Sequence, residues 1–452
     1  MTPFGTIALL LTLFCAAFLA LGTGAVYSTF GMCLLATALL LPIACSVRFR
    51  RDLGSLVLSS LASRQVVVSL IVFWVLPYYA GRNSADASWY DSQAAGLADL
   101  IRAGAWSEIH IGLGSDVVSF LTALMYLPFG PSPEGVVVVS GLVGFIGSLL
   151  FVAAAWVSLP ENRLRGYAAF VLLLPSILFW SSLFGKDSFI FCGLGICAFA
   201  VARWLKYGRW GDLLGIAIGL GAVYAFRPHI ALAVALSLTL VEGVRRRQRG
   251  AGAKSIAVLA LLVPTLIGGV AAVSEFTGVA EVSQESVAAR INQQGLETVG
   301  GESTVETRAS VGIGGFITQL PSGIFRLLFR PFPWEARTIF MFVAALDNLV
   351  LIAILIANRS TIMDTLRHLR TQPFALFSCA LALLLMMIFS TIPNLGLLAR
   401  QKTQITPFLY VLAFSGNRRE KRHPQSFIEK DSGRGGRRMA PVVVDNAVDS
   451  AA

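Results

Sequence analysis

The sequence predicts an all-α, polytopic membrane protein with about 12 transmembrane helices and two larger extracytoplasmic loops. Hydrophobic residues make up 56% of the 452 residues and charged residues only 13%. This composition provides more apolar surface than a soluble fold can bury. The apolar residues are gathered in runs close to membrane length, separated by short polar stretches. We therefore expect residues 1–415 to form a single transmembrane domain.

Twelve nearly continuous apolar runs are the candidate spanning helices. The first has an apolar core like that of a signal peptide, but it lacks a basic start, so we count it as a span. The third and the twelfth runs are short for a bilayer core of about 30 Å, so we expect tilt, extension into their flanks or partial insertion. The runs lie at about residues 5–22, 24–46, 65–79, 135–158, 167–183, 189–204, 212–226, 230–243, 255–274, 338–357, 373–391 and 404–415.

The distribution of Lys and Arg predicts the orientation. Most of the 36 basic residues lie in alternate loops and in the tail after residue 415. Cytoplasmic loops are enriched in Lys and Arg, so we expect both termini in the cytoplasm and the longer loops outside. The same topology explains the net charge of +11 without a nucleic-acid partner. The basic loops are 47–64, 159–166, 203–212, 244–254 and 358–371.

The segment at 416–452 differs from the rest of the chain. It is basic and rich in Gly, and it has no hydrophobic periodicity. Such a composition cannot bury enough apolar surface to fold. We expect a disordered cytoplasmic tail that faces anionic lipid.

The two longer outer loops are predicted at 80–134 and 275–337. In the first, Leu97, Leu100 and Ile101 recur at helical spacing, which predicts a short helix on the membrane surface. The second begins with a polar stretch and ends in an aromatic and basic segment at 316–335 that suits the lipid headgroup layer.

Two carboxylates in the first outer loop, Asp86 and Asp91, are candidate catalytic residues. They flank Trp89 and Tyr90 at the point where the chain leaves the third apolar run. A carboxylate there can accept a proton from a hydroxyl group, and an aromatic ring can stack on a sugar. An ordinary helix N-cap is an equally good explanation for Asp91.

Charged residues in two very short predicted outer turns form the next candidate site. Lys186 and Asp187 separate two apolar runs, and Arg227 and His229 separate the next pair. Asp187 also has a structural explanation as a helix cap, and Lys186 as a residue that reaches phosphate headgroups. Arg227 in a short outer loop opposes the usual topological preference, so we expect it to bind a diphosphate or a similar anion.

Further polar residues lie near predicted span ends or inside a span. Arg330 and Arg400 are candidate anion ligands at the outer boundary, although headgroup anchoring explains Arg330 as well. Asp347 and Asn348 interrupt an apolar run, where we expect a structural hydrogen bond to another helix. The six cysteines lie inside apolar runs without metal-ligand spacing, and no metal or cofactor is expected.

Four short motifs carry a resemblance to a known group of proteins. The motifs are Phe179-Trp-Ser-Ser with Gly185-Lys-Asp, Arg227-Pro-His, Arg330-Pro-Phe-Pro-Trp-Glu335 and Asn394-Leu-Gly-Leu-Leu-Ala-Arg-Gln-Lys402. By these motifs the chain resembles bacterial inner-membrane proteins of exopolysaccharide and O-antigen clusters that are described as repeat-unit polymerases, within or near the polyprenyl-phosphate-dependent membrane glycosyltransferases. The resemblance implies that Asp86 or Asp91 acts as the base and that outer arginines hold the lipid diphosphate.

We therefore expect a glycosyltransferase that polymerises polyprenyl-diphosphate-linked oligosaccharide repeats at the outer face of the inner membrane. Membrane lipids and other polysaccharide-assembly proteins are expected as further partners. The alternatives are a transferase that moves one sugar from a polyprenyl monophosphate, and a flippase for the lipid-linked glycan. The catalytic candidates are Asp86, Asp91 and Asp187, and the substrate-binding candidates are Lys186, Arg227, His229, Arg330, Arg400, Tyr90 and Trp180.

Overall fold

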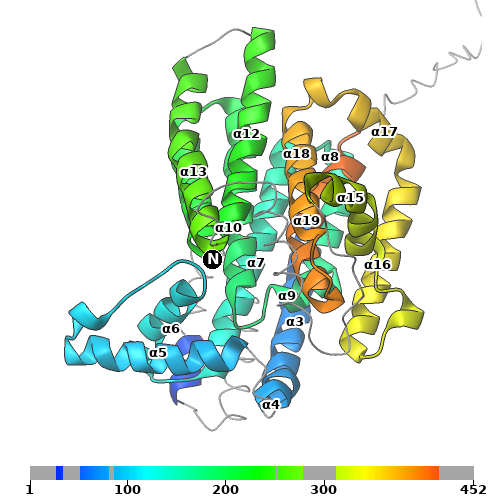
Figure 1. The fold of residues 1–452 in the computed structure, drawn as a ribbon. Helices are drawn as coiled ribbons and strands as arrows, with labels where there is room; N and C mark the ends of the chain where they lie inside the picture. The colour runs from blue at the N-terminus through cyan, green and yellow to red at the C-terminus, as the bar shows by residue number, and fades with distance from the viewer. Residues whose placement is uncertain (1–26, 34–50, 81–85, 250–252, 278–311, 417–452) are drawn as a thin grey trace, which may run out of the picture. The chain divides into compact units, whose positions relative to one another are not determined.

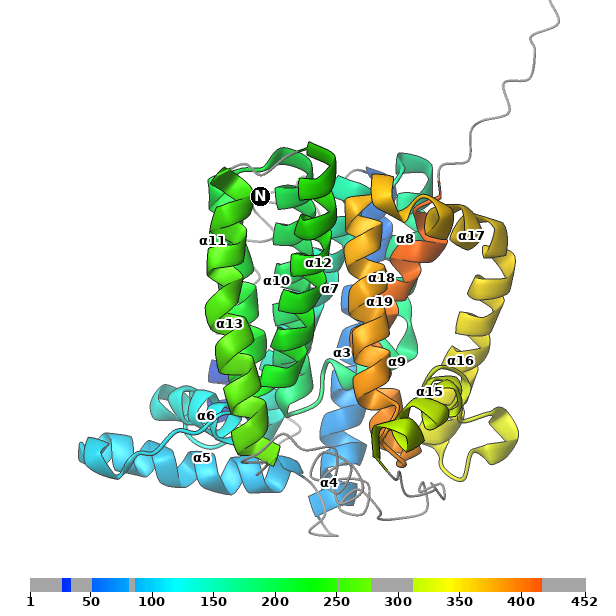
Figure 2. The same cartoon turned by 45° about the horizontal axis from the view of Figure 1, so that its top comes forward.

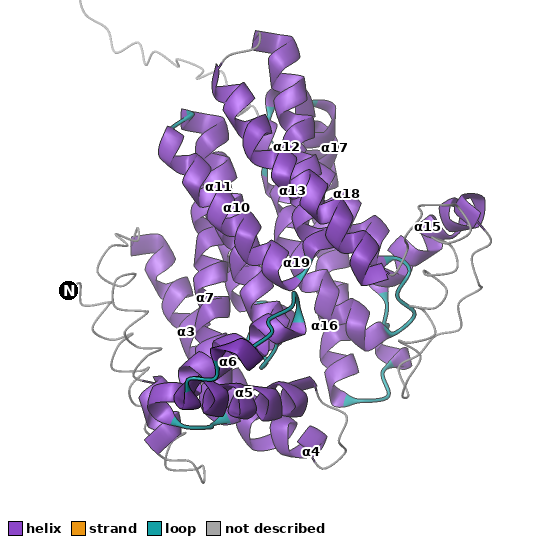
Figure 3. Ribbon diagram, turned by 60° about the vertical axis from the view of Figure 1, so that its left-hand side comes forward, coloured by secondary structure: helices purple, strands orange, loops and turns teal. Residues whose placement is uncertain are grey.

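The computed structural model describes residues 27–33, 51–80, 86–249, 253–277 and 312–416. Every regular element in these ranges is a helix (Figures 1 and 3), which confirms the all-α prediction. The first apolar run, most of the second run, the polar part of the second outer loop and the basic tail lie outside the described residues.

The helices keep the labels of Figure 1. Those of the first half are α3 (Arg51–Leu70), α4 (Leu76–Ala80), α5 (Asp86–Ala103), α6 (Ser115–Phe129), α7 (Pro133–Ser158), α8 (Glu161–Leu173), α9 (Pro175–Trp180), α10 (Lys186–Tyr207) and α11 (Trp210–Phe226). Those of the second half are α12 (Pro228–Arg249), α13 (Ala253–Thr277), α15 (Gly312–Phe329), α16 (Ile339–Ala357), α17 (Arg359–Arg367), α18 (Pro373–Phe389) and α19 (Leu395–Phe414). A π-helical turn at Ile71–Val75 joins α3 to α4.

Several helices have the length and composition of membrane spans. Within the described ranges, four qualify on their own, and the bent pair α16 and α17, with 65° between the two helices, raises the number to five if it is counted as one span. These helices support a membrane protein, whereas the arrangement of 12 spans and its orientation stay predictions. The four are Leu53–Tyr78, Pro133–Ser158, Lys186–Tyr207 and Pro228–Arg247.

The predicted first outer loop, at 80–134, contains more regular structure than the sequence indicated. A helix is present at the expected place as α5, but it begins at Asp86, and a second helix, α6, follows it. Its position on the membrane surface stays a prediction. Figure 2 shows α5 and α6 lying across one end of the longer helices. The helical start of this loop places Asp86 and Tyr90 one turn apart on α5.

Three other boundaries differ from the apolar runs. The predicted loop at 47–64 is helical from Arg51 onward, as part of α3. The predicted span at 167–183 is divided into α8 and α9 at Pro175, because a proline has no N–H to continue the ladder and restricts the residue before it. The last helix, α19, begins at Leu395 and not at 404, and the Asn394 side chain caps it by accepting N–H bonds from Gly396 and Leu397.

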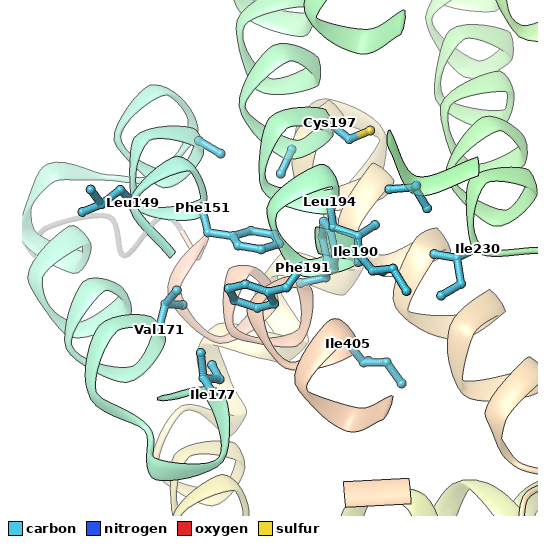
Figure 4. Packing of buried hydrophobic residues seen from close by; sticks show 14 of the residues in the cluster. Leu149, Phe151, Val171, Ile177, Ile190, Phe191, Leu194, Cys197, Ile230 and Ile405 are labelled. Carbon is cyan, nitrogen blue, oxygen red and sulfur yellow. The ribbon is translucent and has the colours of Figure 1, made fainter. Parts of the chain in front are cut away.

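Aromatic side chains join α7, α10 and α19 in the core. The Phe151 ring lies 5.1 Å from the Phe191 ring and 5.4 Å from the Phe408 ring. Figure 4 shows Phe151 and Phe191 side by side, with Ile190, Leu194 and Ile405 nearby. Contacts of this kind are worth about 1 kcal/mol beyond the area that they bury, and they hold α7 against both α10 and α19.

Small residues let α7 and α10 approach closely. A Cβ added at Gly195 of α10 would lie 2.8 Å from the carbonyl oxygen of Gly147 on α7, closer than real contacts allow. Membrane helices that lack a hydrophobic driving force use such small residues to bring their backbones together. Gly195 and Gly147 therefore determine how closely the backbones of α7 and α10 pack.

We predict that Gly195→Ala lowers the free energy of unfolding by about 1–3 kcal/mol, because the new methyl group forces the two backbones apart. Gly221→Ala on α11 is the matched control, since nothing lies within 4 Å of its added Cβ. The control should gain up to about 1 kcal/mol from helix propensity. Thermal unfolding of the purified proteins measures both, and equal stability of the two variants would contradict the packing role of Gly195.

Candidate functional site

Four segments that are far apart in the sequence converge in the structure. They are the start of α5, the start of α10, the link between α11 and α12, and the first half of α19. Together they hold five ionisable residues that interact with one another, which we call the charged cluster. Its members are Asp86, Lys186, Asp187, Arg227 and Arg400.

Asp187 is the centre of the charged cluster. Its side chain is only 3% exposed and accepts hydrogen bonds from Arg400 Nε and, at 3.2 Å, from Gln404 Nε2. Its Oδ1 also lies 3.5 Å from Arg227 Nη2. The helix begins at Lys186 with Gly185 as its N-cap, so the explanation of Asp187 as the cap is wrong. Asp187 is instead the shared counter-ion of two arginines.

The two arginines have further partners on opposite sides. Arg227 Nη1 donates to Gln401 Oε1, and Arg400 Nη1 lies 3.5 Å from Asp86 Oδ2. Both arginine side chains are 16% exposed, whereas that of Asp86 is 66% exposed. Burial lowers the pKa of Arg227, while the charge of Asp187 opposes that shift. The arginines thus line the inner part of the cluster, and Asp86 lies on its accessible side.

Lys186 supplies a third cation whose donors are unused. Its Nζ lies beside Gly114, 3.5 Å from the position of an added Cβ. Its ammonium has no hydrogen-bond acceptor among the described residues, although it is within electrostatic range of the rest of the cluster. His229, in the first turn of α12, is half-buried and within range of Lys186 and Arg227. An incoming anion would therefore find free N–H donors on Lys186.

Tyr90 lies next to the charged cluster but is buried. A Cβ added at Gly185 would lie 3.7 Å from Tyr90 Cε2 and 3.5 Å from Arg400 Nη2, so the ring and the guanidinium flank the same backbone. The ring also packs at 5.9 Å from Phe184 and 5.6 Å from Trp89. Burial and the charge of nearby Asp86 raise the pKa of Tyr90 to about 12. Its phenol therefore stays protonated at neutral pH, and the exposed ring of this pair is Trp89.

Asp91 does not join the charged cluster. It lies inside α5, so the N-cap explanation is wrong, and it accepts a hydrogen bond from Tyr126 Oη at 2.5 Å. Burial and this hydrogen bond raise the pKa of Tyr126. The described contacts give Asp91 a structural role, which is to fix α5 to α6.

Arg330 and Trp180 are also apart from the cluster in their described contacts. Arg330 forms a two-pronged ion pair with Glu335, with Nη2–Oε1 at 2.6 Å and Nε–Oε2 at 3.0 Å. Burial favours the neutral form of Glu335, but the bonds from Arg330 and from the Phe332 N–H lower its pKa. The Trp180 indole is half-buried and packs edge-on against Phe179, 5.0 Å between ring centroids. A binding role for either side chain stays a prediction.

The sequence did not indicate two members of the site, Gln401 and Gln404. Both are buried side chains on α19, at 5% and 0% exposure, and they bind Arg227 and Asp187 respectively. The sequence feature that could have indicated Gln404 is its spacing from Arg400. The two residues lie one helical turn apart once 395–414 is taken as a single helix.

A second group of buried polar side chains lies on another side of α19. It consists of Lys402, Asn348 and Asp347, and we call it the polar layer. Lys402 Nζ donates to Asn348 Oδ1, and Asn348 Nδ2 donates to the carbonyl oxygen of Pro331 at 2.8 Å. The neighbouring Asp347 accepts the N–H of Ser176 at 2.5 Å. These contacts confirm the expected structural hydrogen bonds from Asp347 and Asn348 to other helices, and they place Lys402 inside the protein.

Comparisons of the chain with protein-family models, with curated proteins and with solved structures give no match. Within the described ranges, no group of three or more His, Cys, Asp or Glu residues could hold a metal ion. The charged cluster has three cations and two carboxylates, and one carboxylate is fully engaged. Such a surplus of positive charge, with free donors, suits an anion that has several oxygens.

We predict that Asp187→Asn lowers the free energy of unfolding by about 3–5 kcal/mol, because two buried guanidinium groups lose their shared counter-ion. Asp86→Asn is the matched control. Its carboxylate is mostly exposed and its ion pair is long, so the loss should stay below about 1 kcal/mol. Chemical or thermal unfolding of the purified variants measures the difference. Equal effects of the two substitutions would show that Asp187 is not the central counter-ion.

Proposed function

We propose that the protein is a membrane glycosyltransferase that polymerises polyprenyl-diphosphate-linked repeat units at the outer face of the bacterial inner membrane. The observation that carries this proposal is the charged cluster, in which three cations surround one buried carboxylate. An enzyme that releases a diphosphate needs fixed positive charge where the negative charge develops. The position of the cluster where several helices begin suits a substrate whose lipid tail stays in the membrane.

The proposed reaction uses the accessible side of the cluster. The oxygen of an acceptor hydroxyl attacks the anomeric carbon of the donor sugar, and the bond from that carbon to the diphosphate oxygen breaks. The bonding electron pair leaves with the polyprenyl diphosphate, whose charge is stabilised by Lys186, Arg227 and Arg400. The hydroxyl proton passes to Asp86, the exposed carboxylate beside Arg400.

This scheme gives Asp86 and Asp187 different roles. Both oxygens of Asp187 are bound by protein donors, so it serves to hold the arginines in place. Asp86 has an exposed side chain, and within the described ranges its ion pair is the long contact to Arg400, so its carboxylate can move toward a hydroxyl group. Two carboxylates in different environments commonly divide catalytic work in this way.

A flippase for the lipid-linked glycan is the second candidate. The observation that favours it is the buried layer of Lys402, Asn348 and Asp347 inside α16 and α19, since transporters often hold polar residues at such depth. A transferase that moves one sugar would use the charged cluster in the same way as a polymerase. Chain length separates the polymerase from the single-sugar transferase, and the sidedness of the lipid-linked unit separates it from the flippase.

We predict that Arg227→Lys reduces long polysaccharide chains at least tenfold in cells at equal protein level. A lysine ammonium cannot reproduce the parallel hydrogen bonds of a guanidinium to phosphate oxygens. Arg203→Lys is the matched control, because Arg203 also pairs with a carboxylate, Asp212 at 2.7 Å, but near the other end of α10. The control should keep the wild-type chain length.

Glycan length and the sidedness of the lipid-linked unit are measured in the same strains. The proposal predicts that single repeat units accumulate at the outer face when Arg227 is replaced. Polysaccharide of normal length in the Arg227→Lys variant would contradict the proposal that Arg227 binds the diphosphate. Units confined to the cytoplasmic leaflet would favour the flippase.

A further inference from the structure

Arg64 has an unusual environment for a membrane helix. It lies near the middle of the candidate span Leu53–Tyr78 in α3, and only 1% of its surface is exposed. The sequence had placed it at the end of a predicted cytoplasmic loop, whereas the structure places it inside the helix α3. Placing an arginine at the centre of a membrane helix costs roughly 3 kcal/mol or more. Arginines in the middle of membrane helices are therefore rare and usually have a functional or structural role.

Three serine hydroxyl groups hold the Arg64 guanidinium. Nη1 donates to Ser181 Oγ at 2.8 Å and to Ser182 Oγ at 3.0 Å, and Nη2 donates to Ser148 Oγ at 3.3 Å. No carboxylate pairs with Arg64 in the part of the chain that the structure describes, and its Nε has no hydrogen-bond partner there. The contacts give this cation no counter-charge, so they do not explain it as half of a structural ion pair.

Two of these serines, Ser181 and Ser182, belong to a turn that packs tightly against α7. Ser181 and Ser182 also donate to the carbonyl oxygens of Ile177 and Leu178, at 2.5 and 2.6 Å, which aims their lone pairs at the guanidinium. A Cβ added at Gly144 of α7 would lie 2.0 Å from the Ser181 carbonyl oxygen and 2.7 Å from Arg64 Nη1. The turn can therefore lie where it does only beside a residue without a side chain.

The turn leads directly into the charged cluster. It ends at Gly185, and Lys186 and Asp187 are the first two residues of α10. We propose that Arg64 is a positioning residue: its guanidinium fixes the turn at 181–185 to α3 and α7, and so determines where Lys186 and Asp187 enter the cluster. A guanidinium suits this role because its fork reaches acceptors on two segments at once.

This inference rests on the proposed function only for the statement that the positioned residues bind a lipid diphosphate. The positioning itself is a property of the protein alone. It is tested by backbone hydrogen exchange of the purified protein, which reports local opening residue by residue. Affinity for undecaprenyl diphosphate, measured on the same samples, tests the consequence for the site.

The variants are Arg64→Gln, Arg64→Lys and Ser148→Ala, with Ser140→Ala as the matched control. Ser140 lies on the same helix as Ser148 and is equally buried, but its hydroxyl has no hydrogen-bond partner among the described residues. We expect Arg64→Gln to raise exchange at least tenfold over 178–190 and to weaken diphosphate binding at least tenfold. Arg64→Lys and Ser148→Ala should show smaller effects in the same segment, and Ser140→Ala none.

The outcomes separate the two claims. Unchanged exchange over 178–190 in Arg64→Gln overturns the positioning role. Local opening without any loss of diphosphate affinity overturns the claim that the turn determines how Lys186 and Asp187 enter the binding site. If Arg64→Gln unfolds the whole protein, hydrogen exchange of Ser148→Ala and Arg64→Lys decides whether Arg64 positions the turn. An increase in exchange that is spread evenly over all helices in those variants overturns the proposal. If the wild-type protein binds no diphosphate, the proposed function fails, while the exchange data still decide whether Arg64 fixes the turn.

Discussion

The neutralisation of one buried carboxylate determines how the charged cluster is built. Desolvating an ionised carboxylate costs several kcal/mol, and only well-placed partners offset that cost. Asp187 obtains them from Arg400 and Gln404 of α19 and from Arg227 at the link between α11 and α12. The same pairing that neutralises Asp187 brings three cations together, including Lys186. The site is therefore a consequence of how these helices are held in place.

The buried polar half of α19 is the second element on which this arrangement depends. One side of the helix presents Arg400, Gln401 and Gln404 to the cluster, and Lys402 points to Asn348 on α16. Because these side chains are bound by protein, the helix can lie inside the fold without facing water. Movement of α19 would change the cluster and the polar layer together.

The apolar runs predicted much of the fold, and the failures have a common cause. The runs that became α7 and α10 start within a few residues of the observed helices, because apolar side chains cover nearly the whole of both helices and most of them are packed inside the protein. The starts of α3 and α19 were missed because Arg64 and Arg400 are bound inside the protein, where a charge no longer marks a membrane boundary. For the site, reasoning from boundary charges identified Lys186, Asp187 and Arg227. It could not identify the pair of Asp187 with Arg400, 213 residues apart, because that contact depends on the packing order of the helices.

The central claim is that the charged cluster binds a lipid diphosphate through its surplus positive charge. It is tested most directly by the affinities of the purified protein in nanodiscs for polyprenyl diphosphate and for the free polyprenol. We expect the diphosphate to bind at least tenfold more tightly. Lys186→Gln, which removes the cation with unused donors and leaves the Asp187 pairs intact, should largely abolish that preference. Equal affinities in the wild-type protein, or a preference that Lys186→Gln does not change, would contradict the claim.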